Sequence, residues 1–290
     1  MTRFLAPLLS IALGACGSAA PAAPQAKPAL WKLSDPDTTV YLFGTVHVLP
    51  KEIVWRTPRL DQAVASADEL VLEIADQDDK AALAATYARL AVSPGLPPIA
   101  ERVPPALRPK LDALVEKSGL SRAQLDAMET WAVAITLGAS LYGEIGATSE
   151  QGVETQLRQR FASKPVSGLE TTAQQLGYFD AMPEATQRTL LVSILEDAST
   201  ARADFGKMVA AWASGNTGAI ARTFDQELKA APEIAEVLID RRNANWVTWL
   251  KVRMQKPGTA LVAVGAGHLA GRGSVIDLLR RQGLRVERIQ

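Results

Sequence analysis

The sequence predicts an α/β protein, with a central mixed sheet built from the N- and C-terminal parts of the chain and a largely helical insertion between them. Strand-like apolar runs gather near both ends, at residues 29–43, 69–74 and 260–289. From about residue 79 to 255 the spacing of apolar residues is instead typical of helices, with one short strand-like stretch at residues 166–169. Strands at the ends and helices between them are typical of an α/β sheet with an insertion.

The N-terminal elements follow in a simple order. Residues 29–33 and 39–43 are apolar runs on either side of Ser34-Asp-Pro-Asp37, whose residue types favour a turn, so a β-hairpin is expected to open the domain. A helix over residues 58–68 and a buried strand over residues 69–74 are expected next.

The middle and C-terminal elements are marked by capping residues and breaks. Ser121 and Gln124 resemble a capping box, ahead of one long apolar helix over residues 125–141. Thr171 and Gln174 have the same spacing, and a break is expected near residues 214–218. The chain is expected to close with a strand, a helix and a strand, over residues 260–264, 274–282 and 284–289.

The N-terminus is typical of an exported protein. Residues 1–15 have a positive start and an apolar run that is shorter than the roughly 20 residues of a membrane span, which indicates a signal peptide. Leu13-Gly-Ala-Cys16 resembles a bacterial lipobox, so Cys16 is expected to be lipid-modified; the alternative is an ordinary signal peptide with an incidental cysteine. Residues 16–29 are rich in Ala, Pro, Gly and Ser, as a flexible tether would be.

Composition narrows the functional classes. Lys plus Arg and Asp plus Glu each number 31, and no basic run indicates nucleic acid binding. Cys16 is the only cysteine, so a thiolate metal site and a disulfide are not expected in the mature chain. Residues 30–290 are long enough for a single large domain, and their composition leaves the oligomeric state open.

Both histidines of the chain stand in the same setting. His47 follows an apolar run and lies three residues after Gly44, and His268 follows another apolar run and lies three residues after Gly265. Because glycine fills only 20 of 290 positions, composition alone does not account for the match. Imidazole is a common metal ligand and proton carrier near neutral pH, so the two histidines are expected to act together.

Two carboxylates accompany the histidines at predicted strand ends, where α/β sheets bind ligands. Glu73 lies in a buried strand, and Glu170 follows the strand-like stretch in the middle of the chain. His47, His268, Glu73 and Glu170 are therefore candidate ligands of one divalent metal, or the histidines bind it while one glutamate activates water. The alternatives are a structural role for each histidine, an ion-paired Glu73, and a Glu170 that only caps the next helix.

At these residues the chain resembles the TraB/GumN family, which includes the TIKI-type metalloproteases. The resemblance extends over about residues 30–290, and the paired Gly-x-x-His motifs are its specific part. The segments that carry it include Tyr41-Leu-Phe-Gly-Thr-Val-His47, Gly152-Val-Glu154, Lys164-Pro-Val-Ser-Gly-Leu-Glu-Thr171, Arg241-Arg-Asn243 and Val264-Gly-Ala-Gly-His-Leu269.

The resemblance implies a fold related to erythromycin-esterase-like and ChaN-like haem-uptake proteins. It also implies that the two histidines carry the site, with Glu73 and Glu170 as acidic partners. Arg242 and Asn243 stand where the family keeps an Arg-Asn pair, which could polarise a substrate carbonyl or hold a carboxylate. Glu154 stands where the family more often has Asp. Animal members are described as Mn- or Co-dependent proteases, so the implied cofactor is a divalent metal (Mn, Co, Zn or Fe).

The predicted function is a metal-dependent hydrolase, with a peptidase as the favoured type, that acts on a peptide or small-molecule substrate. The predicted location is the periplasmic face of the bacterial envelope, at the outer membrane, because Gly17 replaces the Asp that often retains lipoproteins at the inner membrane. Two alternatives stay open: a non-catalytic envelope protein that binds peptide, haem or metal, and a structural partner in polysaccharide or envelope assembly.

Overall fold

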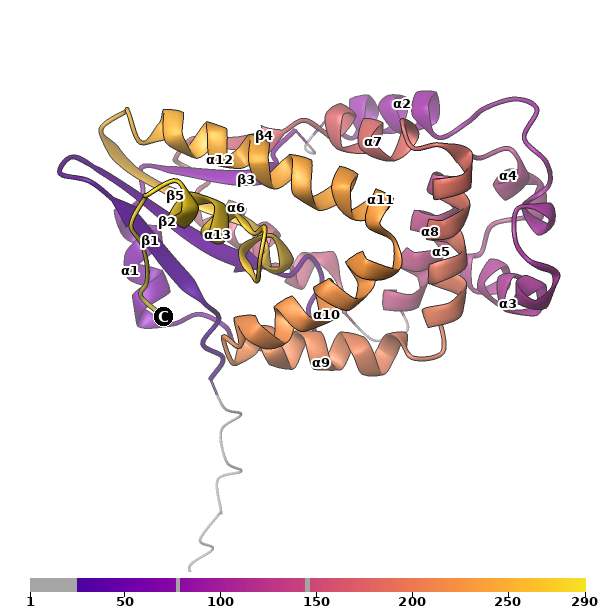
Figure 1. The fold of residues 1–290 in the computed structure, drawn as a ribbon, viewed down its shortest axis with the longest axis horizontal. Helices are drawn as coiled ribbons and strands as arrows, with labels where there is room; N and C mark the ends of the chain where they lie inside the picture. The colour runs from indigo at the N-terminus through magenta and orange to yellow at the C-terminus, as the bar shows by residue number, and fades with distance from the viewer. Residues whose placement is uncertain (1–24, 77–78, 144–146) are drawn as a thin grey trace, which may run out of the picture.

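A computed structural model describes residues 25–76, 79–143 and 147–290. Six strands form one mixed sheet, in the order β4-β3-β5-β2-β1-β6. Strands β2, β5, β3 and β4 run parallel, whereas β1 and β6 pair antiparallel at one edge. The strands are β1 (Leu30–Ser34), β2 (Thr38–Thr45), β3 (Glu69–Ile74), β4 (Val166–Glu170), β5 (Gly258–Gly265) and β6 (Val286–Arg288). Since five of these six come from the two ends of the chain, the predicted fold class is confirmed (Figure 1).

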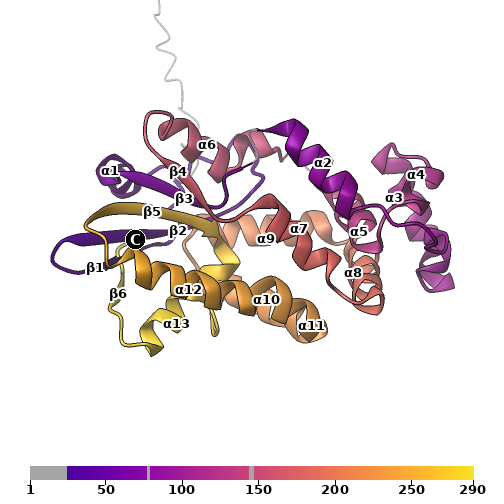
Figure 2. The same ribbon diagram turned by 90° about the horizontal axis from the view of Figure 1, so that it is seen from above.

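The segment between the terminal strands is largely helical. Several of its helices extend beyond the sheet as a separate layer, as both views show (Figures 1 and 2). In the described ranges the α-helices are α1 (Pro58–Ser66), α2 (Lys80–Leu90), α3 (Arg108–Ser118), α4 (Arg122–Asp126), α5 (Thr130–Gly143), α6 (Val153–Arg160), α7 (Thr172–Asp180), α8 (Glu184–Asp197), α9 (Ala201–Ala213), α10 (Thr217–Ala230), α11 (Pro232–Ala235), α12 (Arg241–Arg253) and α13 (Val275–Arg281).

The sheet is covered on both faces, and its residues alternate between the two cores. In β5, Leu261 and Ala263 pack with α1, α6 and α9, whereas Val262 and Val264 pack with α12 and α13. This alternation follows from the two-residue repeat of a strand, and burial on both faces accounts for its continuous apolar run. A third cluster holds α3, α4, α5 and α8 together, away from the sheet.

One predicted element is wrong. The capping box at Ser121 is present, but the single long helix expected over residues 125–141 is divided into α4 and α5. The buried guanidinium of Arg102 donates to the backbone carbonyls of Asp126 and Met128, at 2.6 Å each. These carbonyls are thereby diverted from a continuous helical ladder, so one helix becomes two.

Other predicted boundaries agree with the structure. Thr171 forms a capping box with Gln174 at the start of α7, and α9 ends at Ala213, before the expected break. The predicted signal peptide and Cys16 lie outside the described residues. In the ranges that the structure does describe, no helix is both long and apolar enough to cross a bilayer.

Candidate active site at the carboxyl edge of the sheet

The two Gly-x-x-His motifs leave the sheet side by side. Strands β2 and β5 are parallel neighbours, with Thr45 opposite Gly265, so the segments that follow the two strands leave the sheet at the same edge. A Cβ atom on Gly44 would lie only 3.1 Å from the Cα of Ala266, which explains why this position is a glycine. The adjacent strands therefore bring His47 and His268 to one edge of the sheet.

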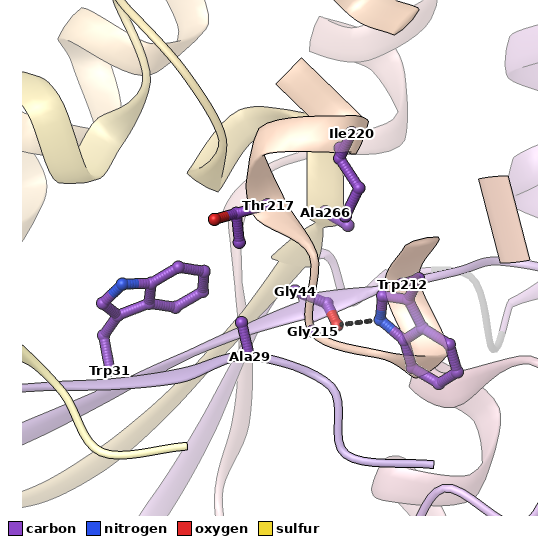
Figure 3. Close-up of a pocket in the computed structure, with 8 residues that line it drawn as sticks. All are labelled: Ala29, Trp31, Gly44, Trp212, Gly215, Thr217, Ile220 and Ala266. Atoms are coloured by element: carbon purple, nitrogen blue, oxygen red, sulfur yellow. Dashed lines mark hydrogen bonds between the residues drawn. The ribbon is translucent and has the colours of Figure 1, made fainter. Parts of the chain in front are cut away.

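A small apolar cavity lies behind the first motif, and Figure 3 shows its lining. The indole Nε1 of Trp212 donates to the carbonyl of Gly44 at 2.8 Å and so anchors the end of β2. The cavity measures about 10 Å³, room for about one water molecule. Its lining contains none of the candidate site residues apart from Gly44: Ala29, Trp31, Gly44, Trp212, Gly215, Thr217, Ile220 and Ala266.

A buried arginine on α12 joins the two predicted carboxylates. The Arg242 side chain donates to Glu73 Oε2 at 2.7 Å and to the two oxygens of Glu170 at 3.0 and 3.1 Å. Trp246, one helical turn further along, donates its indole N–H to Glu170 Oε1 at 2.9 Å. Its ring centroid also lies 4.4 Å from that of His268. One face of α12 thus supplies a cation and an indole to the site.

Glu73 is ionised although it is buried. Burial alone would raise the pKa of its carboxyl, but at the acidic pH where Glu73 titrates His268 is protonated, and its charge, those of Arg242 and His47 and the hydrogen bond from the Gly265 N–H lower the pKa to about 2. The Gly265 N–H donates to Oε1 at 2.7 Å, and Gln175 on α7 donates to Oε2 at 3.4 Å. A carboxylate with so low a pKa stays ionised at neutral pH and is a weak base, so it is better suited to bind a cation than to take up a proton.

His268 is buried and presents one particular ring nitrogen. Its Nδ1 lies 2.7 Å from Asn243 Oδ1, and the Asn243 amide nitrogen donates to the Gly273 carbonyl, so Nδ1–H is the donor to Oδ1. The Nε2 lone pair then lies 3.3 Å from Arg242 Nη1 and 4.0 Å from Glu73 Oε1. Burial lowers the pKa of His268 to about 4, so its imidazole is neutral at pH 7.

His47, unlike His268, carries a proton on both ring nitrogens at pH 7. Its Nδ1 lies 2.7 Å from Glu154 Oε1, and the same oxygen accepts the Thr45 hydroxyl at 2.5 Å. The hydrogen bond to Glu154 outweighs desolvation and raises the pKa of His47 to about 9. The charges of Glu73 and Arg242 also act on His47, which places it within electrostatic range of the buried cluster. Its side chain is 69% exposed, so solvent screening weakens the shift.

The sequence comparisons identify the family. The sequence model of the TraB/PrgY/gumN family matches residues 29–288, nearly the whole chain. The chain belongs to this family.

Its relatives in the TraB/PrgY/gumN family include proteins without a described function. The chain is 26% identical over 246 residues to the uncharacterized protein YbaP of Escherichia coli (strain K12), which covers 83% of this chain and 87% of the relative. An uncharacterized protein of Treponema pallidum (strain Nichols) is 25% identical over 273 residues, which cover 88% of this chain and 80% of the relative. No solved structure is significantly similar to the chain.

The metal that the TraB/GumN resemblance implies can be tested against the donors. In the described ranges no three His, Cys, Asp or Glu side chains are already arranged around one metal position. The donor chemistry nevertheless fits through His47, His268 and Glu73, because each histidine is anchored at Nδ1 by an oxygen, as ligating histidines are. Arg242 engages both carboxylates, but Glu73 has an oxygen 4.0 Å from Nε2 of His268, so Glu73 rather than Glu170 is the better placed ligand.

Some site residues of this TraB/PrgY/gumN member were not expected from sequence. Thr45, Gln175 and Trp246 had no assigned role, although Trp246 follows Arg242 at the four-residue spacing of one helix face. Arg242 holds carboxylates of the chain itself, and Asn243 orients His268. Glu170 does not cap α7, because its N-cap is Thr171.

Proposed function

We propose that the chain is a metal-dependent hydrolase of the bacterial cell envelope, with peptides as the favoured substrates. The observation that carries the proposal is the convergence of three groups at one sheet edge: an anchored neutral imidazole on His268, an anchored exposed imidazole on His47, and the ionised carboxylate of Glu73. Paired groups with displaced pKa values are typical of acid–base sites.

His47, His268 and Glu73 would hold the divalent metal. When bound, such an ion lowers the pKa of a coordinated water toward ~7 and so supplies hydroxide at neutral pH. His47 must lose its proton before Nε2 can ligate, which means that metal affinity is expected to rise with pH. The Asn243 hydrogen bond already keeps His268 in the tautomer whose Nε2 carries no proton, and a metal there would replace the Arg242 N–H that Nε2 now accepts.

Glu73 is the favoured carboxylate ligand. Its carboxylate is ionised, and its Oε1 lies 4.0 Å from Nε2 of His268. Arg242 pairs with both glutamates, so this distance, rather than the ion pair, distinguishes Glu73 from Glu170. Arg242 balances the charge of both carboxylates and keeps them in place.

The location of the chain is part of the same proposal. Lipid modification of Cys16 would anchor the domain at the periplasmic face of the outer membrane. An anchored enzyme there meets peptides and small molecules of the envelope, which agrees with the proposed substrate classes.

Cleavage of a peptide library, read by mass spectrometry, tests the proposal. We expect cuts that require added Mn²⁺, Co²⁺ or Zn²⁺ and that fall by at least about 10- to 100-fold in Glu73→Gln, since loss of a ligand costs at least as much as loss of an outer-shell partner. Glu116→Gln on α3 is the matched control, because Glu116 is exposed and lies outside the site. Metal binding without cleavage would instead favour the non-catalytic binding protein.

A further inference from the structure

The segment from Thr148 to Glu154, here named the clasp, grips the chain around His47. Leu49 and Thr148 exchange two backbone hydrogen bonds of 3.3 Å, one in each direction. The N–H of Val153 donates to the carbonyl of Val46 at 3.1 Å. The backbone on both sides of His47 is therefore held by the clasp rather than free to turn.

Gly152 lets the clasp approach the histidine closely. A Cβ atom at this position would lie 2.0 Å from the backbone carbonyl oxygen of His47, a separation that no side chain could occupy. The close contact puts the first turn of α6 directly beside the histidine. In the Gly152-Val-Glu154 sequence, the glycine therefore allows the backbone to come close to His47, and this places Glu154 within reach of the His47 ring.

Glu154 completes the clasp with its side chain. Its Oε1 accepts the Nδ1–H of His47 at 2.7 Å and the hydroxyl of Thr45 at 2.5 Å. Thr45 is 3% exposed at the end of β2, so the carboxylate is tied to the rigid sheet as well as to α6. With Nδ1 engaged, Nε2 is the nitrogen that His47 can offer to a ligand.

The second histidine has an equivalent partner from a different element. Asn243 on α12 accepts the Nδ1–H of His268 at 2.7 Å, as Glu154 on α6 does for His47. An oxygen partner at Nδ1 fixes ring orientation and tautomer and strengthens a metal-ligating nitrogen, and its loss commonly weakens metal binding by 10- to 100-fold. A charged partner such as Glu154 does this more strongly than an amide.

We infer that Glu154, supported by Thr45, is a positioning residue that holds His47 with Nε2 directed at the metal. This inference rests on the proposed function, because it presumes that His47 is a ligand. Glu154 itself does not touch the metal. Its contribution is to align the exposed histidine, which lacks the packing that orients the buried His268.

Titration of the purified full-length chain with Co²⁺ tests the inference without any substrate. Calorimetry gives the affinity, and the visible absorption of bound Co²⁺ reports its coordination. We expect Glu154→Gln to weaken Co²⁺ binding by about 10- to 100-fold when affinities are measured over a range of pH and corrected for the proton that His47 must lose. We expect Thr45→Val to weaken it by roughly 2- to 10-fold, the effect of one neutral hydrogen bond. Glu154→Asp is expected to fall between wild type and Glu154→Gln, since it keeps the charge but withdraws it by about 1.5 Å.

The control is Glu150→Gln, an exposed glutamate of the same clasp whose side chain hydrogen-bonds with Thr148, and it should bind Co²⁺ as the wild type does. Melting temperatures identify any variant that has lost its fold. If Glu154→Gln does not fold, the Co²⁺ affinity of Thr45→Val provides the second test. Equal Co²⁺ affinity in Glu154→Gln and wild type would overturn the inference and leave the proposed function standing. A wild-type chain that binds no Co²⁺, Mn²⁺ or Zn²⁺ would overturn the proposed metal centre itself, and the inference with it.

Discussion

Replacing Arg242 by methionine removes the guanidinium that pairs with both buried glutamates. The side chains of Arg242, Glu73 and Glu170 are each less than a tenth exposed, and the N–O distances to the carboxylates are 2.7 and 3.0 Å. Methionine keeps an apolar chain of similar length, so packing changes little. Two carboxylates are then left buried without their cation, which is the costly outcome for a buried ion pair.

The expected loss is about 3–5 kcal/mol of unfolding free energy at pH 7, the range measured when one partner of a buried pair is removed. For a chain of this size each kcal/mol lowers the melting temperature by about 2–4 °C, so a fall of roughly 6–20 °C is expected. The loss should shrink at pH 4, because burial raises the pKa of Glu73 once Arg242 is gone, and its carboxyl can then take up a proton and become neutral.

Urea denaturation at both pH values, followed by tryptophan fluorescence, measures the effect. The neighbouring residue supplies the control: Arg241 pairs with Glu236 on the surface, where both side chains are more than half exposed. Arg241→Met should therefore cost under about 1 kcal/mol. A loss in Arg242→Met no larger than in Arg241→Met, or one that is unchanged between pH 7 and pH 4, would refute the ion-pair account.

Three further predictions concern other parts of the molecule. The free energy of unfolding is expected to peak near pH 6.5, as measured by melting at a series of pH values. Burial lowers the pKa of His268 to about 4, so the stability that its neutral ring contributes is complete above pH 6.5 and is lost as pH falls through 4. The pKa of His47 is raised to about 9, so the stability that its charged ring contributes is lost as pH rises from 6.5 through 9. The alkaline decline should be the shallower because His47 is exposed, and stability that keeps rising above pH 8 would count against its pairing. Gly152→Ala is expected to lower the melting temperature sharply, because the new methyl group would lie 2.0 Å from the backbone carbonyl oxygen of His47. The control Gly177→Ala, where an added Cβ would have nothing within 4 Å, should be neutral or stabilising by about 0.5–1 kcal/mol. Equal melting temperatures in the two variants would contradict the close approach of the clasp to His47. Cys16→Ser should move the protein from the membrane pellet to the soluble fraction and abolish labelling with radioactive palmitate; retained labelling would contradict lipidation there.

The strands and both Gly-x-x-His motifs were predictable because they are local patterns. Apolar runs that end in glycine indicate strand ends, and a single charge such as Glu73 within such a run is costly unless it has a function or a partner. The paired histidines then followed from the rule that parallel strands bring their carboxyl ends to one edge of the sheet.

Partners that are distant along the chain could not be predicted in the same way. Arg242 lies 169 residues from Glu73 and 72 from Glu170, so no spacing in the sequence connects them. Trp246 has the apolar helical pattern of a core residue, and burial is consistent with that pattern, yet its indole N–H also binds Glu170. The break between α4 and α5 was missed for the same reason, since the carbonyls that Arg102 binds there lie 24 and 26 residues further along the chain.

The central claim is that the two Gly-x-x-His motifs form one metal centre. Anomalous diffraction at the cobalt edge, from crystals of the full-length chain grown with Co²⁺, tests it most directly. The account predicts a single peak about 2.1 Å from Nε2 of both His47 and His268, with the two nitrogens about 3–4 Å apart and Glu73 adjacent. A peak bound by one histidine alone, or no peak at this edge of the sheet, would contradict it.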